Sequence, residues 1–228
     1  MKHSPPTRKI NNVNLSKKDF LYYLSPIGPP NYPFKLDLLK RNLNNIHISL
    51  GCNFDIAINS YGTGPHQKEK IKNLIKSIDF IDNVFFHFKK GFLTQVFLDN
   101  PDNEKFMHYK YILFIMDDVE IKFMPINEAA SLLKKYKTDC LSPDVTRSTH
   151  RNWVPHGLNI VNRVEIFCLL IQGTSFKKFL NMFKKTNPCF WGVDVMLGFK
   201  KFYCLVCSLF IVDHKLRNDS ANHRTREK

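Results

Sequence analysis

Apolar residues recur along the chain with two different periods, which predict strands and helices that follow one another. Residues 54–62 alternate between apolar and polar side chains and end at Gly62, a pattern typical of a strand that leads into a loop. Residues 68–78 instead carry apolar side chains three and four positions apart, as on one face of a helix. The same patterns predict strands at 83–91, 111–116, 164–171 and 203–214, a short extended piece at 138–145, and helices at 127–136 and 174–185.

The order of these elements predicts a fold class and the extent of the domain. Strands that alternate with helices favour an α/β fold, with a mixed, mostly parallel sheet and helices on both faces. The apolar run at 111–116 does not alternate, so we expect a strand that is buried on both sides. Residues 1–35, rich in proline and polar groups, predict an N-terminal arm. A single domain is expected over 36–217 and a flexible tail over 218–228.

The chain carries a large positive charge, which narrows the range of partners without choosing one. Its 228 residues have a formal net charge of +14 at pH 7. Such a charge attracts nucleic acid, anionic lipid or phosphorylated small molecules. No apolar run reaches the ~18 residues that suggest a membrane span. The first residues also lack the apolar core of a secretory signal, so a cytoplasmic location is predicted.

The strand predicted at 111–116 ends in two adjacent aspartates, Asp117 and Asp118. Ligands of α/β sheets bind beyond the carboxyl ends of the strands, so this pair is expected to lie where a ligand binds. Neighbouring carboxylates repel each other, and a cation that prefers oxygen ligands, Mg²⁺ or Mn²⁺, relieves the repulsion. The alternative is a solvated turn, or a pair that nearby lysines neutralise.

Two more segments bring acidic or imidazole groups to the ends of predicted elements. Asp194 closes the stretch FWGVD, in a turn between a helix and an apolar segment. The last predicted strand ends in Asp213 and His214, and the cations Lys215 and Arg217 follow. Each of these features alone is commonly structural. Their combination with the aspartate pair indicates a site.

In this order, the segments resemble the glycosyltransferases of the GT-A fold. YILFIMDD, VEIFCLL, FWGVD and IVDH are similar to the motifs of a family of uncharacterised plant and bacterial proteins with glycosyltransferase-like folds. The resemblance spans about residues 52–217, and small viral glycosyltransferase domains are similar in size. The family has an acidic residue where Met116 stands, which puts its metal-binding position on Asp118. A second frame takes Asp118 and Glu120 as the acidic motif.

The resemblance implies that the protein moves a sugar from a nucleotide-diphosphate donor to a hydroxyl acceptor. It implies that Asp118 and His214 bind Mn²⁺ or Mg²⁺, and that Asp117 belongs to the same site, on the ribose or on a metal-bound water. The metal would neutralise charge on the leaving diphosphate. Asp194 is the candidate catalytic base of an inverting transfer, or orients the sugar in a retaining one. Its alternative is an acid that caps the following segment.

Further residues are assigned to the donor and the acceptor. The residues expected to bind the nucleotide sugar flank predicted strands: Asn59, Tyr61, Gly62, Asp82 (or Asp55), Lys215 and Arg217. Those expected to contact the sugar or the acceptor are Glu165, Trp191 and Trp153. Aromatic side chains in such loops pack against bases and sugar rings. The predicted acceptor is a glycan or a lipid-linked molecule.

Two other function classes stay open at this point. Clustered acids on an α/β sheet in a basic chain also suit a metal-dependent nuclease or another nucleic-acid-binding protein. The motifs fit that class less well, so no stable nucleic acid partner is expected. Lysine pairs at 177–178, 184–185 and 200–201 flank phenylalanine-rich segments. They predict peripheral contact with an anionic membrane.

Overall fold

The computed structural model describes residues 13–28, 32–62, 64–91, 93–146, 155–183 and 193–214. The strands in these ranges are β1 (Phe20–Ile27), β2 (Phe54–Tyr61), β3 (Ile81–Lys89), β4 (Tyr111–Ile115), β5 (Val119–Phe123), β6 (Cys140–Thr146), β7 (Leu158–Val161), β8 (Cys168–Gln172) and β9 (Cys204–His214). The helices are α1 (Tyr32–Leu50), α2 (Pro65–Lys76), α3 (Leu93–Leu98), α4 (Asn103–Phe106), α5 (Ile126–Tyr136), α6 (Gly173–Leu180) and α7 (Val193–Phe199). None of these described helices is both long enough and apolar enough to span a membrane.

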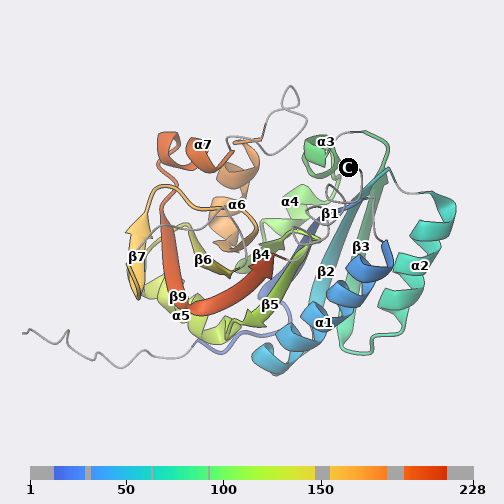
Figure 1. The fold of residues 1–228 in the computed structure, drawn as a ribbon, viewed down its shortest axis with the longest axis horizontal. Helices are drawn as coiled ribbons and strands as arrows, with labels where there is room; N and C mark the ends of the chain where they lie inside the picture. The colour runs from blue at the N-terminus through green and yellow to red at the C-terminus, as the bar shows by residue number, and fades with distance from the viewer. Residues whose placement is uncertain are drawn as a thin grey trace, which may run out of the picture.

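The described strands form one sheet in the order β3-β2-β1-β4-β8-β6-β9-β5, with β7 paired to β9 (Figure 1). The strands β1, β2, β3, β4, β6 and β9 all point in one direction, while β5, β7 and β8 run against them. Parallel strands end at the same edge of a sheet, here called the carboxyl edge. β9 also ends there, because His214 pairs with Val119 directly after the turn that follows β4.

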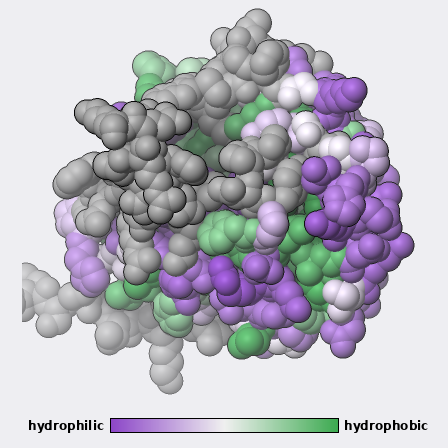
Figure 2. Space-filling model, turned by 45° about the vertical axis from the view of Figure 1, so that its right-hand side comes forward, coloured by the Kyte–Doolittle hydropathy of each residue, from purple (hydrophilic) through white to green (hydrophobic). Residues whose placement is uncertain are grey.

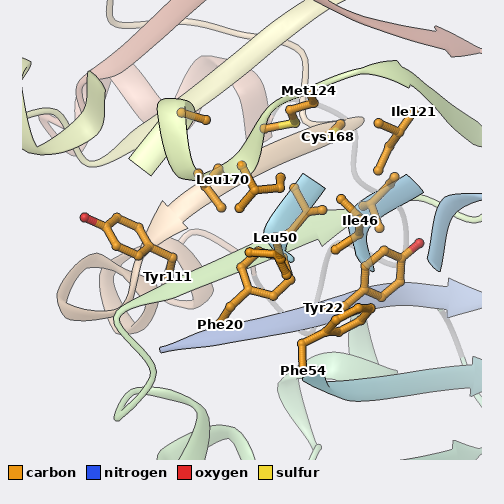
Figure 3. Close-up of a cluster of buried hydrophobic side chains, with 14 of the residues drawn as sticks. Phe20, Tyr22, Ile46, Leu50, Phe54, Tyr111, Ile121, Met124, Cys168 and Leu170 are labelled. Carbon is orange, nitrogen blue, oxygen red and sulfur yellow. The ribbon is translucent and has the colours of Figure 1, made fainter. Parts of the chain in front are cut away.

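Helices cover both faces of the sheet, as predicted. α1, α2 and α5 pack against one face, and α3, α4, α6 and α7 pack against the other (Figure 1). β1 shows the division, because Tyr22 and Leu24 belong to the first apolar cluster while Leu21 and Tyr23 belong to the second. Figure 3 shows the first cluster, where Tyr22 of the sheet lies near Ile46 of α1. The two clusters make the sheet the middle layer of three.

Most predicted elements are confirmed, and most strand ends shift by no more than two residues. The helices differ more: α2 begins at Pro65, three residues before the predicted start, and α6 ends at Leu180, five residues before the predicted end. β2, β3, β4 and β9 correspond to the strands predicted at 54–62, 83–91, 111–116 and 203–214. The strand predicted at 164–171 begins only at Cys168, because the stretch before it packs Val164 and Ile166 into the second cluster as irregular chain. The structure also adds β5 and β7, which were not predicted as separate strands.

The arm predicted over residues 1–35 is corrected by the structure. Phe20–Ile27 is β1, which lies inside the sheet between β2 and β4, and α1 begins at Tyr32. A strand that is buried on both faces carries a continuous apolar run, and FLYYL at 20–24 is such a run. Proline and polar residues on both sides of that run hid the strand.

Candidate functional site

The turn from β4 into β5 and the last residue of β9 build the candidate site. Asp118 lies in that turn, and the pairing of β5 with β9 brings His214 opposite Val119. The Nε2 atom of His214 is 3.0 Å from Oδ2 of Asp118. The ring of Phe167 stacks on the imidazole, with 4.6 Å between the ring centroids. The pair predicted from two distant strand ends is therefore in direct contact at the carboxyl edge.

Each member of the pair also has a buried polar atom that lacks a hydrogen-bond partner among the described residues. These atoms are Oδ1 of Asp118 and Nδ1 of His214. A buried polar atom without a partner costs about 1–3 kcal/mol. When Nε2 carries the imidazole proton, Nδ1 has a free lone pair, as a metal ligand requires. The site therefore presents one carboxylate oxygen and one imidazole nitrogen that a cation would satisfy.

The 3.0 Å contact joins Nε2 of His214 to Oδ2 of Asp118 and is a hydrogen bond between the two side chains. Mg²⁺ bonds of about 2.0–2.1 Å at right angles also put neighbouring ligand atoms about 3 Å apart, so an ion that bound these two atoms would replace that hydrogen bond. The described residues offer no group of three or more His, Cys, Asp or Glu side chains for a metal. A metal held here would have two protein ligands from this pair. Magnesium sites of this kind are completed by substrate phosphates and water.

Asp117 points into a different environment from Asp118. Its Oδ2 atom is 2.7 Å from Nζ of Lys35 and accepts the backbone N–H of Gly28 at 3.0 Å. Lys35 also donates to the carbonyl oxygen of Gly28 at 2.7 Å. We call these three residues the Lys35 clamp. It joins the end of β1, the first turn of α1 and the β4–β5 turn.

The clamp is buried, and burial dominates its electrostatics. The side chains of Lys35 and Asp117 are 5% and 11% exposed, and the space around them has no room for a water molecule. The pKa of Asp117 is raised to about 6, mainly by burial. The positive charge of Lys35 lowers this pKa, while the neighbouring charge of Asp118 raises it. This matches the alternative in which a lysine neutralises one aspartate. The carboxylate of Asp117 is thus held by the Lys35 clamp, and its place in a metal site stays a prediction.

Glu120, the acid of the second motif frame, also forms ion pairs with cations. Its carboxylate is 2.7 Å from Nζ of Lys122 and 3.5 Å from Nε of Arg41. Glu120 and Lys122 lie on β5, and Arg41 lies on α1. Glu120 is the second residue of β5 after the β4–β5 turn. Both frames include Asp118, so its contact with His214 agrees with either of them.

The residues predicted to bind the nucleotide at the end of β2 divide into two kinds. Asn59 is fully buried, and its amide donates to the carbonyl oxygen of Leu24 and accepts from Asn100. It therefore fixes strands and a loop. Tyr61 and Gly62 lie at the carboxyl edge, where Tyr61 is half-buried and Gly62 is exposed. Both stay candidates for contact with a base.

Tyr61 is linked to the Asp118–His214 pair through the clamp. A Cβ atom on Gly28 would lie 2.3 Å from Cε1 of Tyr61, so the ring packs directly on the glycine. The N–H of the same glycine bonds to Asp117, which precedes Asp118. A continuous series of contacts thus connects the end of β2 with the β4–β5 turn along the carboxyl edge.

The prediction for Asp82 is corrected by its place in the sheet. Asp82 is the second residue of β3, which is parallel to β2, so it lies at the edge opposite to Tyr61. Its carboxylate pairs with Lys17 at 3.2 Å and accepts from Asn53 at 3.0 Å. The alternative Asp55 begins β2 at the same far edge, where it accepts from Asn83. Neither carboxylate is at the carboxyl edge.

Asp194 lies in the first turn of α7 and is held by an arginine. Its Oδ2 atom is 2.8 Å from Nη2 and 2.9 Å from Nε of Arg163. Arg163 lines a cavity of about 360 Å³ between α7 and the end of β7. From Arg163 the chain runs through Glu165, which is half-buried, to Phe167 against His214. Four residues of chain span at most about 14 Å. The backbone of Arg163 therefore lies within about 14 Å of the backbone of Phe167.

Several predicted site residues lie outside the described residues: Lys215, Arg217, Trp153 and Trp191. The sequence interpretation missed Lys35, Gly28 and Phe167. Lys35 carried a signal, because it is on the same helical stripe as Leu39, Asn42 and Ile46, all of which are buried. A lysine on an apolar helix face needs a buried acidic partner.

Comparisons with known proteins identify the class of fold. The mixed sheet with helices on both faces is a GT-A (Rossmann-like) fold. A crystal structure of GalNAc-T7 with UDP, GalNAc and Mn²⁺ matches this chain with a TM-score of 0.64 at 11% sequence identity. The match covers 87% of this chain and 43% of that chain, so the protein spans less than half the length of its neighbour. No family model and no curated protein matches the sequence.

At this identity the likeness concerns the fold. The GT-A fold predicted from the motifs is confirmed, whereas the particular plant and bacterial family stays a prediction. The roles of individual residues in chemistry also stay proposals, which rest on the geometry of the carboxyl edge.

Proposed function

We propose that the protein is a metal-dependent glycosyltransferase that moves a sugar from a nucleotide-diphosphate donor to a hydroxyl of a glycan or a lipid-linked acceptor. One observation carries the proposal. At the carboxyl edge of a GT-A fold, Asp118 and His214 are 3.0 Å apart, and each has a buried polar atom without a partner among the described residues.

In the proposed site, Asp118 and His214 hold Mn²⁺ or Mg²⁺. The bound ion supplies positive charge to the diphosphate as it leaves. The Lys35 clamp holds Asp117 and so fixes the turn that carries Asp118. Tyr61 and Gly62 border the base of the donor. Lys215 and Arg217, which follow His214 in the sequence, are proposed to contact the diphosphate.

Asp194 is proposed to act on the acceptor or the sugar, together with Glu165. A general base must reach the proton that it removes, by a direct hydrogen bond or through one water. The ion pair with Arg163 fixes the orientation of the Asp194 carboxylate. Trp153 and Trp191 are proposed to pack on sugar rings of the donor or acceptor. The neighbour GalNAc-T7, crystallised with UDP, GalNAc and Mn²⁺, supports a nucleotide-sugar donor for this fold.

The proposal predicts that UDP or GDP raises the melting temperature of the protein, and that the shift requires Mn²⁺. A ligand at one hundred times its Kd stabilises the folded state by about 2.7 kcal/mol. Differential scanning fluorimetry with each nucleotide, with Mn²⁺ and with EDTA, measures the shift. Stabilisation by DNA or RNA, with no shift from either nucleotide, would contradict the proposal and favour the nuclease class.

A further inference from the structure

The turn between α7 and β9 presents aromatic and basic side chains on the surface. We call residues 199–203, Phe-Lys-Lys-Phe-Tyr, the aromatic–basic turn. Phe199 is 78% and Tyr203 is 49% exposed, while Phe202 between them is fully buried. Lys200 and Lys201 are exposed. Val195, one helical turn before Phe199, adds a further exposed apolar side chain at 41%.

The aromatic–basic turn is held in one conformation by backbone contacts. The N–H groups of Lys200, Lys201 and Phe202 donate to carbonyl oxygens of α7 at 3.0, 3.1 and 2.9 Å. Lys201 has a left-handed backbone conformation, with φ of 51°. The Nζ atom of Lys178 donates to the carbonyl oxygen of Lys201 at 2.7 Å. These hydrogen bonds fix the backbone of the turn that follows the exposed Phe199.

The lysines around the turn differ in whether they form ion pairs with acidic residues among the described residues. Lys178 pairs with Asp139 at 3.3 Å and lies over the ring of Phe202. The charge of Lys178 is thus engaged by groups of the protein itself, which disfavours the membrane contact predicted for this lysine. Lys177, Lys200 and Lys201 form no ion pair with a described acidic residue. Lys184 and Lys185 lie outside the described residues. The unpaired charge is therefore centred on the turn itself.

We infer that the aromatic–basic turn docks the protein on an anionic lipid surface. Exposed aromatic side chains suit the boundary between lipid headgroups and acyl chains, and flanking lysines suit anionic headgroups. Each lysine near such a surface strengthens binding by about fivefold. The apolar pair Val195 and Phe199 favours lipid over nucleic acid, because an aliphatic side chain offers no face for base stacking.

This inference does not depend on the proposed metal site, although Val195 and Phe199 share a cavity with Arg163, the partner of Asp194. The turn precedes Cys204 at the start of β9, whereas His214 is the last residue of that strand. The two features are thus separated by the full length of an 11-residue strand. A protein docked through the turn would keep the carboxyl edge free of the contact.

Vesicle sedimentation tests the inference with phosphatidylcholine vesicles, with and without phosphatidylserine, at low and high salt. We expect the protein to sediment with the anionic vesicles at low salt. The double variant Lys200→Gln/Lys201→Gln should bind about 25-fold more weakly, from two lysines at fivefold each. Phe199→Ala should bind roughly tenfold more weakly, because a large apolar surface no longer enters the lipid.

Matched control variants lie elsewhere on the molecule. Ile48→Ala, in α1, removes an apolar side chain that is also 78% exposed. Lys70→Gln/Lys76→Gln removes two exposed charges from α2, on the hydrophilic side that Figure 2 brings forward. Both controls should bind within about twofold of the unchanged protein, since they lie away from the turn.

Three results would overturn the inference. One is no sedimentation with phosphatidylserine vesicles at low salt. Another is an equal loss of binding in the turn variants and the controls, which would show general charge attraction. The third is binding of an RNA oligomer that depends on Phe199 and the two lysines, in a protein that ignores vesicles.

Discussion

The variant Lys35→Met is expected to lower the free energy of unfolding by about 3–5 kcal/mol, the usual effect of removing one partner of a buried ion pair. Methionine fills a similar volume but leaves the carboxylate of Asp117 buried without its cation. It also leaves the carbonyl oxygen of Gly28 without the Lys35 donor. Urea unfolding followed by circular dichroism measures the loss.

The pH dependence of this loss follows from the raised pKa of Asp117. In the folded protein that pKa is about 6, above the ordinary aspartate value of 3.8. A raised carboxyl pKa contributes stability at low pH, which is lost as the pH rises through about 6. Without Lys35 the carboxyl pKa rises further. The cost of Lys35→Met should therefore be larger at pH 8 than at pH 5.

A double-mutant cycle separates the ion pair from general packing. Asp117→Asn alone leaves Lys35 buried without its anion and should also destabilise the protein. The variant that carries both changes has no uncompensated charge, so its loss should be smaller than the sum of the single losses. Additive losses that do not vary with pH would contradict the clamp.

Asp194→Asn is expected to bind the donor almost normally and to transfer sugar about 10²–10⁴-fold more slowly, as when a positioned general base is lost. Asparagine keeps the shape of aspartate and one acceptor for Arg163, but it cannot take up a proton. Release of UDP or GDP in the presence of glycan and lipid acceptors measures the rate. Nucleotide affinity is measured separately.

Asp102→Asn is the matched control for this variant. Asp102 also pairs with a cation, Lys105 at 2.6 Å, at the start of a helix. Its replacement should leave both rate and affinity unchanged. Full transfer activity in Asp194→Asn would return Asp194 to its alternative, an acid that caps α7 and holds Arg163.

The ends of buried strands were the part of the site that the sequence could predict. Asp118 and His214 each follow a long apolar run, and such runs become strands that end at a common edge. The ladder between β5 and β9 then sets their contact. This pairing depends on a strand that the sequence analysis did not separate from the turn, so the distance between them was beyond prediction.

Other assignments failed where direction in the sheet mattered. Asp82 was chosen because it adjoins a predicted strand, but it lies at the start of β3 and therefore at the far edge of the sheet. Asn59 was chosen because it lies near a strand end, but its side-chain amide forms hydrogen bonds with Leu24 and Asn100 inside the protein. Side-chain hydrogen bonds of this kind join segments that are distant in sequence, and periodicity does not reveal them.

The central claim is that Asp118 and His214 form a metal site for a nucleotide diphosphate, and Mn²⁺ binding followed by electron paramagnetic resonance tests it most directly. The signal of free Mn²⁺ should fall when the protein and UDP or GDP are added together. Asp118→Asn should weaken this binding at least tenfold, because it removes a ligand charge with little change of shape. Asp82→Asn, at the opposite edge, should leave it unchanged. Equal Mn²⁺ affinity in Asp118→Asn and the unchanged protein would contradict the account.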